Sequence, residues 1–122
     1  MKDEEMRSDN ILLEKSKKFA VRVVKLYKYL EVEKRETIMS RQLLRSGTSI
    51  GANIHEAVYG QSKKDFTAKM SIALKEAVET EYWLQLLIET EYLTEEQYES
   101  IQQDCGEVAR MLTAIVKTSR GT

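Results

Sequence analysis

Apolar residues recur along this chain at the three- and four-residue spacing of amphipathic α-helices, in four separate segments. The alternating pattern typical of strands is missing, and the sequence contains no proline. The spacing predicts helices over about residues 10–33, 36–59, 63–90 and 94–118. The stripes consist of Leu12, Phe19, Val23, Leu26 and Leu30, with Ser16 in the gap; Leu43, Gly47, Ile50, Ile54 and Ala57; Phe66, Met70, Ala73, Ala77, Thr80, Leu84 and Leu87; and Tyr98, Ile101, Cys105, Val108, Leu112 and Ile115.

Local signals mark where these helices begin and end. Ser62 followed by Asp65 is a helix start signal, and Thr94 followed by Gln97 has the spacing of a capping box. Gly60 is placed to end the second helix in a left-handed conformation. Because the connections are short, neighbouring helices must run in opposite directions. The sequence therefore predicts an all-α, up-down-up-down antiparallel four-helix bundle that forms a single domain over residues 1–122.

Two glycines inside the second helix, Gly47 and Gly51, need an explanation because each costs about 1 kcal/mol relative to alanine. The neighbouring Ser46, Ser49 and Asn53 are also small or polar. Small side chains allow helix axes to approach closely, so we expect a partner helix to fill this space. We also expect Ser49 and Asn53 to form hydrogen bonds with that neighbour.

The same stretch contains "GTSIG", which matches the G-x-S-x-G motif of serine hydrolases. That motif needs a preceding strand and a histidine from elsewhere in the fold. His55, the single histidine, lies on the same predicted helix as Ser49 but on a different side. We therefore expect no catalytic residue here, and we assign His55 to the surface or to a subunit contact.

Metal and cofactor chemistry also lack the required residues. Glu76, Glu79 and Glu81 suggest a metal site in a bundle core, but a di-iron site of the ferritin type needs two Glu-x-x-His motifs. We interpret these glutamates as solvated or ion-paired. Cys105 is the single cysteine and lies on an apolar stripe, where we expect a buried, unreactive side chain. No metal and no cofactor is predicted.

Charge is unevenly distributed, although the net charge is only −1. Residues 7–64 are rich in lysine and arginine, and residues 65–122 are rich in aspartate and glutamate. The two halves can attract each other within one fold or across a subunit contact, and the basic half can instead serve RNA or DNA. The basic residues of the first helix are Lys15, Lys17, Lys18, Arg22, Lys25 and Lys28, and Lys63 and Lys64 are further candidates. Of these, Lys15, Lys18, Arg22 and Lys25 form one helical stripe that can follow a phosphate backbone.

Some apolar residues exceed what one core can bury. The segment "YWLQLLI", from Tyr82 to Ile88, is apolar on nearly every side of its helix. Exposed apolar patches on soluble proteins often mark protein contacts, and tryptophan and tyrosine are favoured at binding hot spots. We therefore expect a symmetric homo-oligomer.

The apolar runs are too short to span a membrane. The acidic start "MKDEEMRSDN" lacks the apolar region of a secretory signal. With neither a membrane span nor a secretory signal in the pattern, we expect a cytoplasmic location, and the single cysteine cannot form an intrachain disulfide.

Two blocks, "LLRSGTSIGANIHEA" and "SKKDFTAKMSIALKEAVETEYWLQLLIETEYL", resemble the bacterial four-helix-bundle proteins named for the intervening sequences of 23S ribosomal RNA genes, the S23 family. This resemblance implies a ring-shaped homopentamer. It extends to the accessory variability determinant of diversity-generating retroelements, a basic pentamer that binds a reverse transcriptase and nucleic acid. The family-typical positions are Arg45, Ser46, Gly47, Ser49, Gly51, Asn53, Glu56, Lys75, Glu76, Glu79, Trp83 and Leu84. Relatives often have glycine where this chain has Glu91.

The residues and the resemblance together predict a non-enzymatic, oligomeric interaction scaffold. The alternative is an accessory factor that binds RNA or DNA and works with a reverse transcriptase or ribosomal RNA. In that case, we expect weak and non-specific binding through Lys15, Lys18, Arg22 and Lys25.

Overall fold

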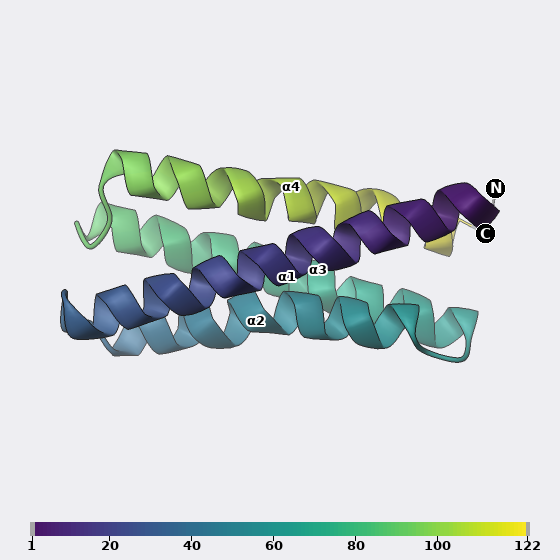
Figure 1. Cartoon of the computed structure of the whole chain (residues 1–122), viewed down its shortest axis with the longest axis horizontal. Coiled ribbons are helices and arrows are strands. Elements are labelled where there is room, and N and C mark those ends of the chain that lie inside the picture. The colour runs from purple at the N-terminus through teal and green to yellow at the C-terminus, as the bar shows by residue number, and fades with distance from the viewer. Residues whose placement is uncertain (1, 122) are drawn as a thin grey trace.

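The computed structural model describes residues 2–121, with side chains described from residue 7 onward, and these residues form an antiparallel bundle of four helices (Figure 1). The helices are α1 (Lys2–Val32), α2 (Ile38–Val58), α3 (Lys63–Glu89) and α4 (Glu95–Arg120). Both ends of the chain lie at the same end of the bundle (Figure 1). The predicted all-α four-helix fold is confirmed, while residues 1 and 122 of the predicted domain lie outside the described residues.

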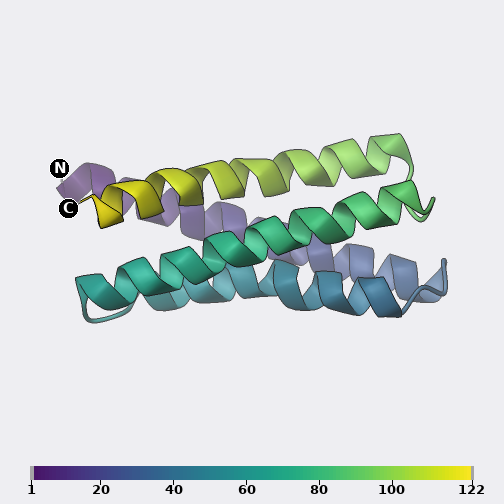
Figure 2. The ribbon, with the colours of Figure 1, turned by 180° about the vertical axis from the view of Figure 1, so that it is seen from behind.

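The four helices follow one another around the bundle in chain order. α2 packs between α1 and α3, α3 packs against α4, and α4 closes the bundle against α1. The contact between α1 and α4 is the least extensive of the four, and the two helices diverge toward the end of the bundle that carries the α1–α2 and α3–α4 connections (Figures 1 and 2). The seam between the first and last helices is therefore the one with the least packing.

The first helix is longer than its apolar pattern predicts, because α1 begins at Lys2 instead of near residue 10. Residues 2–9 carry no apolar stripe, but five of these eight residues are lysine, glutamate, methionine or arginine, which have high helix propensity. Propensity thus extends the helix beyond the part that packs in the core. A prediction based on apolar spacing alone misses this segment.

The start of α2 depends on a buried carboxylate that the sequence pattern did not reveal. Glu36, only 7% exposed, accepts hydrogen bonds from the backbone N–H groups of Ile38 and Met39 at 3.1 Å and of Ser40 at 2.8 Å. The N-cap residue Thr37 makes no side-chain capping bond of its own. Glu36 thus satisfies three N–H groups that have no partner within the helix, and its negative charge lies at the positive end of the helix dipole.

Both predicted start signals of the later helices are confirmed. Ser62 accepts a hydrogen bond from the Asp65 N–H at 3.0 Å. At α4, Thr94 accepts from the Gln97 N–H at 3.1 Å, and the Gln97 side chain accepts from the Thr94 N–H at 2.9 Å, which completes the capping box. The S-x-x-D and T-x-x-Q spacings were sufficient to find these caps.

The prediction that Gly60 ends α2 in a left-handed conformation is wrong, because no glycine in the described part of the chain has a positive φ. α2 instead ends at Val58, and the C-cap residue Tyr59, with φ −96° and ψ 10°, donates its N–H to the His55 carbonyl at 3.1 Å. The Gly60 N–H donates a hydrogen bond to the Ala57 carbonyl at 3.3 Å. The chain therefore leaves this helix through a tightened last turn that needs no left-handed residue.

The end of α3 does use the left-handed conformation, and it uses Glu91 with φ 68°. The Tyr92 N–H donates to the Leu87 carbonyl at 2.8 Å, and the Glu91 N–H donates to the Ile88 carbonyl at 3.0 Å. This pair of bonds defines a Schellman motif with Glu91 at the position where glycine is usual. The cap forms despite the missing glycine, at the cost of placing a Cβ in a disfavoured backbone region.

Most of the predicted stripe residues form the core, with Leu12, Phe19, Leu43, Ile50, Leu84 and Leu112 among its fully buried members. Leu26, Phe66, Tyr98 and Ile115 were also predicted but are only partly buried, whereas Leu93 and Val116 are buried without having been predicted. Ser16 is also buried, and its hydroxyl donates to the Leu13 carbonyl at 3.1 Å. The predicted burial of Cys105 is confirmed. Burial raises the pKa of its thiol to about 12, so that the unreactive thiol form dominates at neutral pH.

Candidate interaction surface

A network of charged and aromatic side chains joins α2 to the outer part of α3, and it unites four of the family-typical positions. From α2, Arg45 donates from Nη1 to Oε2 of Glu76 at 3.1 Å and from Nη2 to Oε2 of Glu79. Trp83 donates its indole N–H to the same Glu79 oxygen at 2.9 Å. We call these four residues the Arg45–Trp83 network. It fixes the orientation of an arginine and of the single tryptophan in the chain.

The electrostatics of the network favour its charged state. The hydrogen bond from Trp83 lowers the pKa of the Glu79 carboxyl, and Arg45 and Lys75 lower it further. In turn, the hydrogen bond to Glu79 raises the pKa of Arg45. The Glu76 side chain is 14% exposed and that of Arg45 is 50% exposed, so water still reaches this ion pair from the arginine side. The network is thus held together by charge-assisted hydrogen bonds.

The other family-typical residues of α2 lie on two sides of the helix, and the two sides contact different helices. Toward α3, Ser46 accepts a hydrogen bond from the Thr80 hydroxyl at 2.9 Å, and Glu56 forms an ion pair with Lys69 at 3.0 Å. Toward α1, a β-carbon at Gly47 would lie 2.8 Å from both γ-methyl groups of Val23. The predicted close approach therefore occurs at Gly47, and its partner is α1.

The other small residues of the motif behave differently from Gly47. A β-carbon at Gly51 would lie 3.5 Å from the Ser16 carbonyl oxygen, which is an ordinary van der Waals distance. The Asn53 side chain donates to the Ser49 carbonyl of its own helix at 2.8 Å, so the expected bond from Asn53 to a neighbouring helix is not the one that forms. Leu84 is fully buried in the core.

Next to the Arg45–Trp83 network, α3 exposes three large apolar side chains. Val78 and Tyr82 are 57% and 54% exposed and lie four residues apart on one side of the helix, and we call them the α3 ridge. Ile72, 42% exposed, lies on a different side of α3. The Tyr82 ring meets the Trp83 ring edge to face, with 5.2 Å between centroids. Of the segment from Tyr82 to Ile88, Leu84 and Leu87 are buried in the core, whereas Tyr82 remains largely outside it. Trp83 and Ile88 also pack against the core, so Tyr82 is the one residue of the predicted segment that counts among the exposed large apolar side chains, and the other two, Ile72 and Val78, lie outside that segment.

The basic stripe of α1, defined by Lys15, Lys18, Arg22 and Lys25, runs beside α4. Lys15 forms an ion pair with Glu107 at 2.5 Å. Arg22 forms an ion pair with Asp104 at 2.6 Å and also donates to Ser100, to its carbonyl at 3.1 Å and its hydroxyl at 2.9 Å. These contacts confirm attraction between the basic and acidic halves within one fold. Sequence reasoning missed the three α4 partners, which share one face through their spacing of four and three residues.

Lys18 and Lys25 are the more accessible members of the stripe. Lys18 is 75% exposed and pairs with Glu14 on its own helix at 3.0 Å. Lys25 is exposed and lines a groove of about 510 Å³ between α1 and α4, with Glu96 and Gln97 on the opposite wall.

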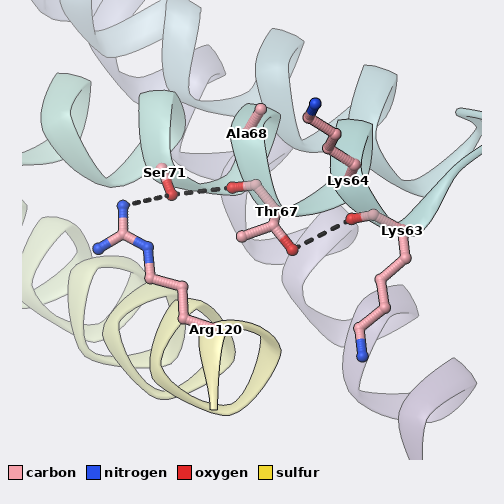
Figure 3. A pocket seen from close by; sticks show the side chains of 6 residues that line it. All are labelled: Lys63, Lys64, Thr67, Ala68, Ser71 and Arg120. Carbon is pink, nitrogen blue, oxygen red and sulfur yellow. Dashed lines mark hydrogen bonds between the residues drawn. The ribbon is translucent and has the colours of Figure 1, made fainter. Parts of the chain in front are cut away.

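The two further candidates for phosphate contact, Lys63 and Lys64, lie apart from this stripe. They line a shallow groove of about 560 Å³ together with Thr67, Ser71 and Arg120, at the start of α3 and the end of α4. Arg120 donates to the Ser71 hydroxyl at 3.2 Å, while Lys63 and Lys64 extend in different directions (Figure 3). The cations of this groove therefore do not converge on one point.

His55 lies on the surface, as predicted, in ring contact with Tyr59 at a centroid distance of 4.7 Å. In the part of the chain with described side chains, no three histidine, cysteine, aspartate or glutamate residues are grouped so that they could hold a metal ion. Among the described residues, no helix combines the length and apolar character needed to cross a membrane.

Comparison with known proteins places this bundle in a family. The family described as 23S rRNA-intervening sequence protein matches residues 8–114, and the chain belongs to this family. The chain is also similar to a protein of unknown function from the S23 ribosomal protein family of Bacteroides thetaiotaomicron VPI-5482, whose crystal structure is known. The two share 60% sequence identity over 90% of this chain and 98% of the other, with a TM-score of 0.88. No curated protein matches this chain.

Proposed function

We propose that this protein is a non-enzymatic interaction scaffold of the cytoplasm that assembles through the outer face of α3 into a ring-shaped homopentamer. The observation that carries the proposal is the α3 ridge beside the Arg45–Trp83 network. The ring and the number of subunits come from the family resemblance. Cytoplasmic location is supported by the single buried cysteine, which needs no oxidising compartment.

The composition of this face is that of a binding hot spot. Tryptophan, tyrosine and arginine dominate such sites. This face offers all three, because Trp83 and Arg45 belong to the Arg45–Trp83 network and the Tyr82 ring contacts the Trp83 ring. Because Glu79 already fixes Trp83 and Arg45, little side-chain freedom remains to be lost on association. Preorganised side chains of this kind favour binding without any change of fold.

The same contacts support a non-enzymatic role for the family-typical residues. Arg45, Glu76 and Glu79 bind one another, and Glu79 also accepts the Trp83 indole N–H. Arg45 thus has its structural partners across the α2–α3 contact, and Trp83 has its partner on its own helix. We propose that their role is to position Trp83 and the adjoining ridge.

Light scattering after gel filtration tests this proposal with two matched variants. Val78→Glu places a charge in the α3 ridge, and Val32→Glu places the same charge at a valine that is 67% exposed at the end of α1. We expect the assembly of Val78→Glu to have a lower molar mass than that of the parent, because fewer subunits associate. Its circular dichroism should keep the helical signal of the parent. Val32→Glu should keep the parent mass. Equal masses for the two variants would contradict assembly through the α3 ridge.

A second candidate function is binding of RNA or DNA through the α1 stripe. The observation that favours it is the exposure of Lys18 and Lys25 on a stripe long enough to contact several phosphates. Its test is fluorescence anisotropy with a structured RNA and with a DNA duplex at low and moderate salt. The charge reversal Lys18→Glu with Lys25→Glu should abolish binding, whereas Arg110→Glu with Lys117→Glu on α4 should weaken it less.

A further inference from the structure

The α1 stripe and the acidic face of α4 match each other in register. The two helices run in opposite directions, so Lys15 meets Glu107 and Arg22, further along α1, meets Asp104 and Ser100, earlier on α4. Glu107 and Asp104 are therefore ion-paired with the two cations of the stripe that face the contact between α1 and α4. The other two members of the stripe, Lys18 and Lys25, form no ion pair with these carboxylates.

This seam is also the least tightly packed in the bundle. α1 and α4 make the fewest contacts of the four neighbouring helix pairs, and they diverge toward the groove lined by Lys25 and Glu96. All four side chains of the two ion pairs are between 39% and 49% exposed. Ion pairs with this much solvent contact contribute little to stability, so another anion can replace the carboxylates without unfolding the protein.

We propose that Asp104 and Glu107 form an autoinhibitory contact that occupies Arg22 and Lys15, and that the phosphate backbone of a nucleic acid must displace these two carboxylates to engage the whole α1 stripe. Lys18 and Lys25 make the first contact because they are the exposed members of the stripe. Arg22 and Lys15 then exchange a carboxylate for a phosphate. This inference rests on the second candidate function, and it explains how a chain of net charge −1 can keep a basic binding face.

The test removes the two carboxylates while preserving their shape. The variant Asp104→Asn with Glu107→Gln frees Lys15 and Arg22 from their ion pairs, and Arg22 keeps its hydrogen bonds to Ser100. Fluorescence anisotropy with a labelled RNA duplex, measured over a salt series, gives the affinity and its salt dependence. Because parent and variant contact the same phosphates once bound, the slope of log K against log salt should be similar for the two proteins, whereas the variant should bind several-fold more tightly at low salt since no carboxylate has to be displaced.

The matched control is Glu89→Gln with Glu99→Gln, which changes the net charge by the same amount at exposed carboxylates that take no part in the two ion pairs. We expect the control to bind as the parent does. An equal gain in both double variants would show a general charge effect and overturn the autoinhibitory contact.

Two further outcomes separate this inference from the function on which it rests. If the parent already binds with the affinity of Asp104→Asn with Glu107→Gln, nucleic-acid binding stands and the autoinhibitory contact is wrong. If no variant binds at low salt, while circular dichroism shows intact helices, the second candidate function fails and the inference fails with it.

Discussion

The indole N–H of Trp83 donates to Glu79 at 2.9 Å, and the acceptor is the same carboxylate oxygen that binds Arg45. One glutamate on α3 therefore fixes both an aromatic ring on its own helix and a cation on α2. Since Trp83 is the single tryptophan of the chain, its fluorescence reports directly on this contact.

The first prediction follows from the lowered pKa of Glu79, whose largest cause is the hydrogen bond from Trp83. A carboxylate with a lowered folded-state pKa stabilises the fold above its unfolded-state pKa and loses this contribution as the pH falls through the folded-state value. We expect Glu79→Gln to be less stable than the parent at neutral pH and the difference to shrink below about pH 4.5. Urea denaturation followed by Trp83 fluorescence at several pH values measures this. A difference that stays constant with pH would show that the charge of Glu79 is irrelevant.

The second prediction compares two glycines of one helix. Gly47→Ala places a methyl group 2.8 Å from both γ-methyl groups of Val23, whose β-branched side chain has little freedom to move. Such overpacking costs about 1 to 3 kcal/mol, which outweighs a gain in helix propensity of about 1 kcal/mol. Thermal denaturation should show a destabilised protein.

Gly51→Ala is the matched control for that change. The added methyl group has ordinary contact distances at this position, so the gain in helix propensity should stabilise the protein by about 0.5 to 1 kcal/mol. If both alanine variants shifted the melting temperature in the same direction, the difference in packing that we describe for the two glycines would be wrong.

The third prediction concerns the carboxylate cap of α2. Glu36→Ala removes the acceptor of three backbone N–H groups, at Ile38, Met39 and Ser40, and should cost about 1 to 2 kcal/mol. The control Glu33→Ala changes an exposed glutamate of the same connection and should stay within about 0.5 kcal/mol of the parent. Chemical denaturation of both variants decides the matter, and equal stabilities would argue against the cap.

The fourth prediction concerns the left-handed residue that ends α3. Glu91 has φ 68°, a conformation in which glycine is not penalised, so Glu91→Gly should stabilise the protein by about 0.5 to 1 kcal/mol. The same change at Glu89, in the last turn of α3, should instead destabilise it by about 1 kcal/mol. Melting temperatures of the two variants should therefore move in opposite directions, and a fall at Glu91→Gly would contradict the Schellman geometry.

Much of the fold follows from the sequence because helix spacing, caps and core use local rules. The stripe of Leu12, Phe19 and Val23 and the capping box of Thr94 needed only the distances between residues along the chain. The start of α1 was missed because high helix propensity leaves no apolar pattern. Glu36 was missed because a carboxylate preceding the N-cap is not part of the usual capping signature.

The candidate site was predictable only in part, because its contacts join different helices. Arg45, Glu79 and Trp83 were among the family-typical positions. That Arg45 and Trp83 both donate to one oxygen of Glu79 depends on how α2 and α3 align. Gly47 and Gly51 look equivalent in the sequence, and only the position of α1 separates them. The pairing of Lys15 with Glu107 likewise depends on the register of two helices far apart in the chain.

The central claim is that this bundle assembles with copies of itself through the outer face of α3. Light scattering coupled to gel filtration, on the parent protein at micromolar concentration, tests it most directly. The proposal predicts a mass about five times the 14.1 kDa of one chain, in agreement with a ring of five subunits. A mass near 14.1 kDa would show a monomer and contradict the proposal.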